Sequence, residues 1–297
     1  MKTAKLLIKR NVKLFFKDKG LFFTSLITPF ILLVLYATFL KNVYTDSFMQ
    51  FIPNGLISEN LIESLVGGQL ISSILAVSCV TVAFCSNFLM VQDRANGSIK
   101  DIRMSPVSSS TLALGYYVAS LFATLTICLT SAALCLGYIA LVGWYLTVTD
   151  VLLIILDVFL LSFFGTAISS IINFFLSTQG QISAVGSIIS SSYGFLCGAY
   201  MPISSFGDGL QKAVMFLPGT YGTGLLRNHA TRAVFAEMEK EGLPSGVITQ
   251  LKDSIDANLY FFGNEVSSLS MYLVLSGTVI ILVAVYVLMN ALKKKEK

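Results

Sequence analysis

Residues 92–107 read QDRANGSIKDIRMSPV, a polar stretch between two long apolar runs at residues 61–91 and 110–143. The stretch holds two aspartates, two arginines and a lysine, whereas the runs on either side are almost free of charge. A run of roughly 20 apolar residues is long enough to cross a bilayer. The polar stretch is therefore predicted to connect two membrane spans.

The composition indicates an integral membrane protein. Hydrophobic residues make up 55% of the 297 residues and charged residues only 12%, whereas a soluble domain carries about 25% charged residues. Because the apolar residues gather in runs of spanning length, we expect an all-α membrane protein in a single domain. The six predicted spans are residues 21–40, 61–91, 110–143, 151–176, 181–202 and 267–291.

Lysine and arginine gather on one side of this predicted topology. Of the 20 basic residues, seven lie in residues 1–20, three in the polar stretch and four in the C-terminal LKKKEK. Because cytoplasmic loops are enriched in lysine and arginine, both termini and the polar stretch are predicted to be cytoplasmic. Residues 203–265, where acids outnumber bases, are then extracytoplasmic.

The basic N-terminal segment has the periodicity of an amphipathic helix. Lys5, Lys9 and Lys13 recur every four residues, with apolar side chains between them. Such a helix is suited to the inner membrane surface, where anionic headgroups attract its lysines. The alternative is that these charges do no more than set the topology.

Several classes of enzyme are excluded by motifs that the sequence lacks. The five cysteines lie in apolar runs without a C-x-x-C pair, and His229 is the single histidine, so we expect neither a disulfide framework nor a metal site. The sequence has no G-x-x-x-x-G-K-[ST] phosphate-binding loop and no G-x-S-x-G nucleophile motif. We therefore predict a non-catalytic chain, for which any ATP is bound by another subunit.

Two features inside the spans are candidates for a substrate path or a gate. The fifth predicted span is rich in serine and contains Ser187, Ser191 and Tyr193; such small residues either pack helices together or line a polar strip. Asp157 lies within the fourth span, where an ionisable group is costly and often functional. At 1.5 Å per residue, Asp157 is about 10 Å from the outer end of that span, close enough to face water.

The outer region 203–265 is predicted to be helical. Residues 203–222 are amphipathic and interrupted by glycine and proline, as in short helices that dip into the membrane interface. Residues 225–241 and 247–262 are predicted to be the two helices of a hairpin, joined by the turn GLPSG.

Three stretches resemble the permeases of type-2 ATP-binding-cassette exporters. Residues 93–117 are similar to that family's cytoplasmic connection, in which Gly-(Thr/Ser) leads to (Arg/Met)-Ser-Pro-Val-Ser. Residues 195–227 are similar to the segment that ends the family's fifth span, with Gly, Pro-Ile and a Leu-Pro-x-Thr-Tyr run. The basic surface helix before the first span also fits, and with the six spans the resemblance covers nearly the whole chain.

The resemblance implies a fold, partners and a cargo. The fold is all-α, with a cytoplasmic elbow helix in residues 1–20, six spans, and re-entrant helices before the last span. The partners are a separate nucleotide-binding subunit, which binds ATP and Mg, and a second permease in a homodimer or heterodimer. The long outer hairpin favours export of a drug, peptide or lipid-like substrate across the cytoplasmic membrane of a bacterium. A polysaccharide or teichoic-acid-type exporter is the alternative.

The resemblance also gives the polar stretch a role. Residues 92–109 would be the cytoplasmic coupling segment, the surface on which the ATPase subunit acts. The residues that this role implies are Asp93, Arg94, Gly97, Ile99, Ile102 and Arg103. Without the resemblance, a solvated loop that sets the topology would be the simpler interpretation. An ion-coupled secondary transporter is a further alternative, although it would need charges at the bilayer midplane, and only Asp157 comes near.

Labelling of introduced cysteines tests the predicted topology. A cysteine in place of Glu239 is expected to react with a membrane-impermeant thiol reagent in intact cells, whereas one in place of Lys295 is expected to react only after lysis. The reverse pattern would overturn the orientation that the charge distribution predicts.

Overall fold

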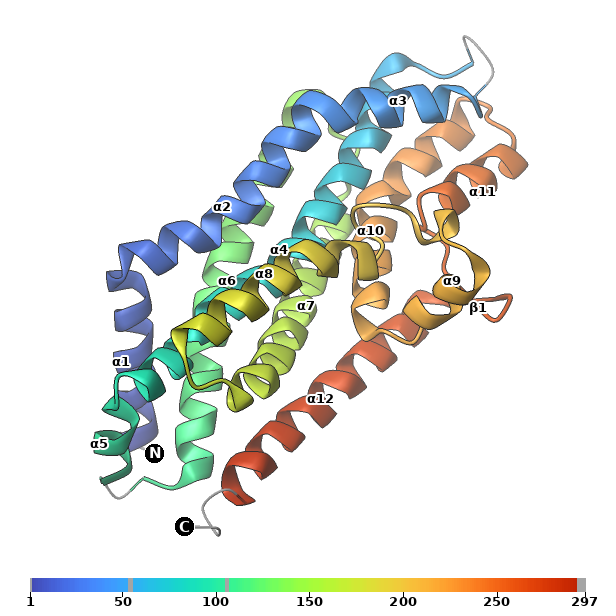
Figure 1. Ribbon diagram of the computed structural model, residues 1–297. Helices are drawn as coiled ribbons and strands as arrows, with labels where there is room; N and C mark the ends of the chain where they lie inside the picture. Colours follow the sequence, from blue (N-terminus) through green and yellow to red (C-terminus); the bar gives the residue numbers. More distant parts are fainter. Residues whose placement is uncertain (1, 53–55, 105–106, 293–297) are drawn as a thin grey trace.

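The computed structural model describes residues 2–52, 56–104 and 107–292, which form a bundle of helices (Figure 1). The predicted all-α fold is confirmed, since the only strands in this described part are β1 (Tyr260–Phe261) and β2 (Asn264–Glu265), paired in one short antiparallel hairpin. The helices, in chain order, are α1 (Lys2–Lys17), α2 (Lys19–Leu35), η1 (Tyr36–Leu40), α3 (Lys41–Met49), α4 (Glu59–Ala95), α5 (Ser98–Met104), α6 (Ser109–Val142), α7 (Val148–Phe175), α8 (Gln179–Leu196), η2 (Ile203–Ser205), α9 (Asp208–Val214), α10 (Pro218–Lys240), α11 (Ser245–Ser254) and α12 (Ser268–Leu292).

Five helical segments of the described chain are long and apolar enough to cross a membrane. They are α4, α6, α7, α12 and the segment Ser25–Met49, which continues from α2 through the π-helical turn η1 into α3. Each overlaps a predicted span, which confirms a multi-pass membrane protein. The remaining predicted span, 181–202, overlaps α8 and is not among these five segments.

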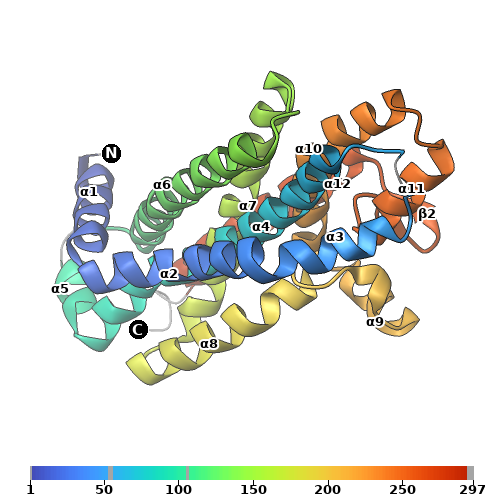
Figure 2. The same ribbon diagram turned by 90° about the horizontal axis from the view of Figure 1, so that it is seen from above.

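Helix α4 is the centre of the bundle. It is 37 residues long, about 55 Å at 1.5 Å per residue, and so it exceeds the roughly 30 Å of a hydrocarbon core. It packs against α2, α6, α7, α8 and α10, and Figure 2 shows it between α6 and α8. A helix enclosed on this many sides is buried all round, and α4 thereby links the two ends of the molecule.

Hydrogen bonds between small polar side chains hold the three central helices together. The Asn87 amide on α4 donates to the hydroxyls of Ser169 and Ser170 on α7, at 3.0 and 2.6 Å. The Asn87 carbonyl oxygen accepts from the hydroxyl of Ser120 on α6 at 3.2 Å. Because lipid offers no competing donors or acceptors, such bonds stabilise helix association within a membrane.

Glycine allows two close approaches to α4. A Cβ atom at Gly165 of α7 would lie 2.8 Å from the carbonyl oxygen of Cys79 and 2.9 Å from the Cα of Val80. A Cβ atom at Gly68 of α4 would lie 2.7 Å from the carbonyl oxygen of Ala230 on α10. The helix backbones at these two places are too close together for any larger residue.

The amphipathic helix α1 lies at one end of the bundle. Figure 1 shows α1, α5 and the end of α12 at one end of the molecule, and α3 and α11 at the other. Helix α1 is amphipathic: Leu7, Asn11 and Phe15 are buried at four-residue spacing, whereas Lys5, Lys9 and Lys13 are exposed. The buried face of α1 packs against α6.

The outer region differs from its prediction in two places. Helix α10 begins at Pro218, before the expected start at residue 225, because proline suits the first turn of a helix, where its missing N–H is not needed. The second predicted helix, 247–262, is wrong beyond Ser254. There Asp256 has a φ of 54° and Phe262 a φ of 49°, backbone angles that a right-handed helix cannot contain, and the chain turns into the β1–β2 hairpin.

Replacement of Gly165 tests the close packing of α7 on α4. Gly165→Ala is expected to lower the free energy of unfolding by about 1–3 kcal/mol, because the added methyl group overpacks the contact. Gly137→Ala on α6 is the matched control, since no atom lies within 4 Å of a Cβ there. The measurement is thermal unfolding of the purified protein in detergent, and equal unfolding temperatures for both variants would contradict the packing.

Candidate functional site

The polar stretch forms the end of α4, a tight turn and the short helix α5. Gly97 occupies the turn with a φ of 80°, a left-handed conformation that glycine adopts without steric cost. Helix α5 then runs from Ser98 to Met104. Pro106 and the side chain of Arg103 lie outside the described residues.

Asp93 points into the protein and not toward a partner. Its side chain is paired with the Arg10 guanidinium of α1, whose nitrogens donate at 2.6 and 3.0 Å, and it accepts from the Tyr116 hydroxyl of α6 at 2.5 Å. The hydrogen bond to Asp93 raises the pKa of Arg10. Since Asp93 is only 6% exposed, the expected contact with an ATPase is replaced by an internal tie between α1, α4 and α6.

Arg94 also has a structural role. One of its guanidinium nitrogens donates to the carbonyl oxygens of Asn173, Phe174 and Leu176, at 3.0, 2.6 and 3.1 Å. These carbonyls belong to the C-terminal end of α7, where the last turn leaves its acceptors unsatisfied and a positive charge is favourable. Arg94 thus fixes the end of α7 to the end of α4.

The exposed face of α5 carries residues other than the expected isoleucines. Ile99 and Ile102 are half-buried and pack against a cluster of α1 and α6 side chains. Lys100 and Asp101 are exposed, and Met104 is 81% exposed. Two charges and one large apolar side chain therefore lie on the accessible surface of α5.

The predicted path residues of the fifth span lie on different faces of α8. Ser187 and Ser191 are exposed, and the Ser191 hydroxyl donates to the Ser187 carbonyl at 2.9 Å, which satisfies it within the helix. Tyr193 faces the protein, where a side chain at Gly219 would meet its ring. No hydrogen bond or ion pair in the described chain connects these three residues to Asp157.

Asp157 does not face water as expected, because α10 and α12 cover it. Its exposed fraction is 0%. One carboxylate oxygen lies 2.6 Å from Nδ1 of His229 on α10, and the other accepts from the Tyr272 hydroxyl of α12 at 2.6 Å. Two turns away, Arg232 of α10 lies 2.6 Å from Asp150 of α7. These contacts fasten α7 to α10 and α12.

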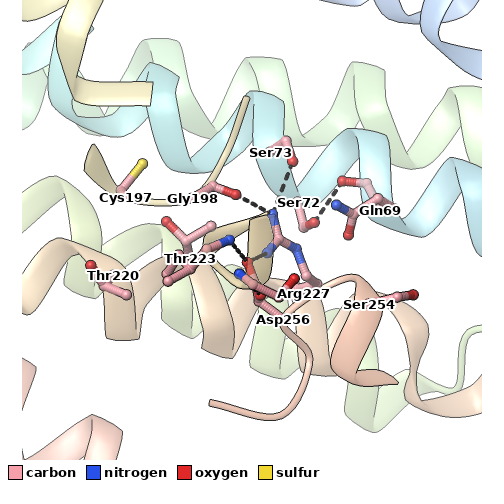
Figure 3. Close-up of polar contacts among 12 residues, drawn as sticks. Gln69, Ser72, Ser73, Cys197, Gly198, Thr220, Thr223, Arg227, Ser254 and Asp256 are labelled. Atoms are coloured by element: carbon pink, nitrogen blue, oxygen red, sulfur yellow. Dashed lines mark hydrogen bonds and ion pairs between the residues drawn. The ribbon is translucent and has the colours of Figure 1, made fainter. Parts of the chain in front are cut away.

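A buried ion pair lies at the centre of the outer end. Figure 3 shows the Arg227 guanidinium of α10 between Asp256, Ser73 and the Gly198 carbonyl. The distances are 3.4 Å to the Asp256 carboxylate, 3.4 Å to the Ser73 hydroxyl of α4 and 2.8 Å to the Gly198 oxygen. The Arg227 side chain is 1% exposed, so a single cation joins three segments that are far apart in sequence.

The Asp256 carboxylate has backbone partners as well. It accepts from the amides of Ile203 and Ser204, at 2.5 and 3.3 Å. Burial raises the pKa of Asp256, and the Arg227 charge and the two amides oppose that increase. The pair with its hydrogen bonds therefore holds the loop after α8 against α10 and the end of α11.

Residues 3–229 match the family model of the ABC-2 type transporter. The chain belongs to the ABC-2 type transporter family and is an ABC transporter permease, a membrane component that works with an ATP-binding partner. Comparison with curated proteins found no significant match.

Sequence reasoning missed the residues that pair inside the protein. His229 was noted only as the single histidine, and neither Arg227, Asp256 nor Tyr272 was singled out. One indication was present: Arg227 lies in GTYGTGLLR, a run otherwise made of small and apolar residues, where an arginine needs a partner. The sequence does not reveal which of the acids is that partner.

A double-mutant cycle tests the pair of Arg227 and Asp256. Arg227→Met is expected to cost about 3–5 kcal/mol of stability, because it leaves a buried carboxylate without its cation. Asp256→Asn keeps a residue that tolerates the left-handed backbone and leaves the guanidinium unpaired. The double variant is expected to lose clearly less than the sum of the two losses, measured by thermal unfolding in detergent. Strictly additive losses would contradict a direct interaction.

Proposed function

We propose that this permease is part of an ATP-driven exporter, and that the exposed face of α5 is the surface on which the nucleotide-binding subunit acts. The observation that carries the proposal is the two-sided character of α5. Ile99 and Ile102 pack its inner face against a buried cluster with side chains from α1, α4, α6, α7 and α12, while Lys100, Asp101 and Met104 face outward. A helix fixed on one side and exposed on the other can transmit a push to the spans.

The residues around α5 make this connection stiff. Asp93 joins α4 to α1 and α6, and Arg94 joins α4 to the end of α7. A displacement of α5 would therefore move several spans together. In this proposal Asp93, Arg94 and Gly97 position the helix, Arg103 remains a candidate contact, and Lys100, Asp101 and Met104 bind the partner.

A second permease would complete the transport path. The exposed face of α8, which carries Ser187 and Ser191 beside the apolar Ile188 and Phe195, is proposed to line that path between two copies. A surface of mixed small polar and apolar side chains suits an amphipathic cargo, such as a drug, peptide or lipid-like molecule, better than a polysaccharide.

Asp157 fits a gate better than an ion-coupling site. An ion-coupled secondary transporter would need charges at the bilayer midplane. On α12, Tyr272 and Leu292 are 20 residues apart, about 30 Å of helix, which equals the thickness of a hydrocarbon core. The Asp157–Tyr272 contact is then near the outer edge of the membrane, where its opening would separate α7 from α12.

Substitution of Met104 tests the coupling proposal. Met104→Asp buries an unpaired carboxylate at the proposed contact, which costs several kcal/mol and is expected to weaken association about a hundredfold, since each 1.4 kcal/mol is a factor of ten. The readouts are copurification of an ATPase subunit from membranes and ATP hydrolysis by the complex.

Met104→Leu serves as the control, because it keeps the apolar contact and is expected to copurify the ATPase normally. Both variants are first compared with the parent protein for membrane insertion and thermal unfolding. Normal copurification and hydrolysis with Met104→Asp would show that α5 is not the docking surface.

A further inference from the structure

Three phenylalanine rings form an exposed cluster in the outer region. Phe216, in the turn between α9 and α10, lies 5.4 Å from Phe261 and 6.1 Å from Phe262, measured between ring centroids. Phe261 and Phe262 are 4.8 Å apart. Phe216 is 63% exposed and Phe262 is 60% exposed. Aromatic side chains that are packed together and still exposed mark a surface that contacts something else.

The β1–β2 hairpin holds Phe262 in an unfavourable backbone conformation. Phe261 pairs with Asn264, so the loop has two residues, Phe262 and Gly263, with φ angles of 49° and 85°. A two-residue loop with both φ angles positive is a type I′ turn, which strongly favours Asn-Gly. A bulky residue at positive φ is a genuine outlier, and such strain is kept where a function requires it. Turn formation alone therefore does not account for Phe262, and we infer that its aromatic side chain serves another function.

The depth of the cluster follows from its contacts with α12. Phe261 packs against a buried group that includes Met271, in the first turn of α12, and Tyr272 packs against the same group. Since Tyr272 is about 30 Å of helix from Leu292, the rings are at the level where the hydrocarbon core ends. The hairpin also ends only a few residues before Ser268, where the span begins.

The surface beside the rings suits phospholipid headgroups. Phe261 and Phe262 line a cavity of about 330 Å³ together with charged side chains, which are Lys212 and three aspartates (Asp208, Asp253 and Asp256). Leu210, which is 49% exposed, adds an apolar side chain on the same short helix α9. Aromatic rings at the edge of the hydrocarbon with charged groups next to them are the arrangement by which proteins anchor to a membrane interface.

We propose that Phe216, Phe261 and Phe262 insert into the outer leaflet of the lipid bilayer and anchor the outer region to the membrane beside α12. The lipid-facing surface of α12 begins with Leu269 and Leu273, which are 69% and 66% exposed, and the ring cluster continues this surface. The three rings hold the hairpin and α9 at the membrane surface, and α10 extends away from that surface. This inference does not depend on coupling to an ATPase.

Quenching by brominated lipids tests the insertion. Trp144 is the single tryptophan of the chain, so Trp144→Phe provides a background in which one tryptophan at a time can be placed. The variant with Phe262→Trp is reconstituted in nanodiscs of phosphatidylcholine brominated at a shallow or a deep acyl position. Its fluorescence is expected to fall at least twofold with the shallow bromines and less with the deep ones.

Two matched variants serve as the lipid-exposed and the water-exposed control for the quenching of Phe262→Trp. Leu273→Trp, on the lipid-facing side of α12, is expected to be quenched by both lipids, with more quenching by the deep bromines than Phe262→Trp shows. Glu239→Trp, exposed near the far end of α10, is expected to show no quenching. The three variants share one background and one preparation, so they differ only in the position of the ring.

Two outcomes would overturn the proposal. If Phe262→Trp is unquenched and emits like Glu239→Trp, the cluster faces water. If it is unquenched but its emission is shifted to the blue, protein covers the ring, as a second copy of the chain would. Each outcome is independent of whether Met104→Asp releases the ATPase, because the nanodiscs contain the permease without a partner.

Discussion

The low dielectric of the protein interior constrains this chain more than any other factor, and the buried pair of Arg227 and Asp256 shows how the chain satisfies it. An isolated charge removed from water costs many kcal/mol, and a buried pair offsets that cost best when most of its remaining donors and acceptors are also bonded. Here the guanidinium reaches Ser73 on α4 and the carbonyl of Gly198, and the carboxylate reaches the amides of Ile203 and Ser204. The outer end is assembled around that requirement.

The end of the bundle that holds α1 and α5 follows the same rule with different residues. Asp93 and Arg94 are adjacent in sequence, yet one accepts from Arg10 and Tyr116 and the other caps the C-terminal end of α7. Both belong to α4, the helix that also carries Ser73, the partner of Arg227. A single helix is therefore hydrogen-bonded to its neighbours at Ser73, near its middle, and at Asn87, Asp93 and Arg94 toward its C-terminal end. Because α4 is continuous, a displacement of α5 is expected to be transmitted along α4 to the helices packed against it.

Local and tertiary preferences disagree at a few positions, and these deserve the closest experimental study. Phe262 occupies a turn that favours asparagine, and η1 interrupts the α-helical path between α2 and α3 with a π-helical turn. Proteins retain such conflicts where they serve a function. Asp157, buried against His229 and Tyr272, is a third example, because an apolar residue at that position would cost less to bury.

The sequence by itself determined the number and position of most spans, because a run of about twenty apolar residues is a local property that needs no partner. It also determined the amphipathic first helix, which depends on residue spacing alone. It did not determine which charges face outward. Asp93 meets a partner 83 residues away, and Asp157 meets partners 72 and 115 residues away. Only the tertiary structure decides such pairings, because the energy of a buried charge depends on which distant group the fold brings within hydrogen-bonding distance.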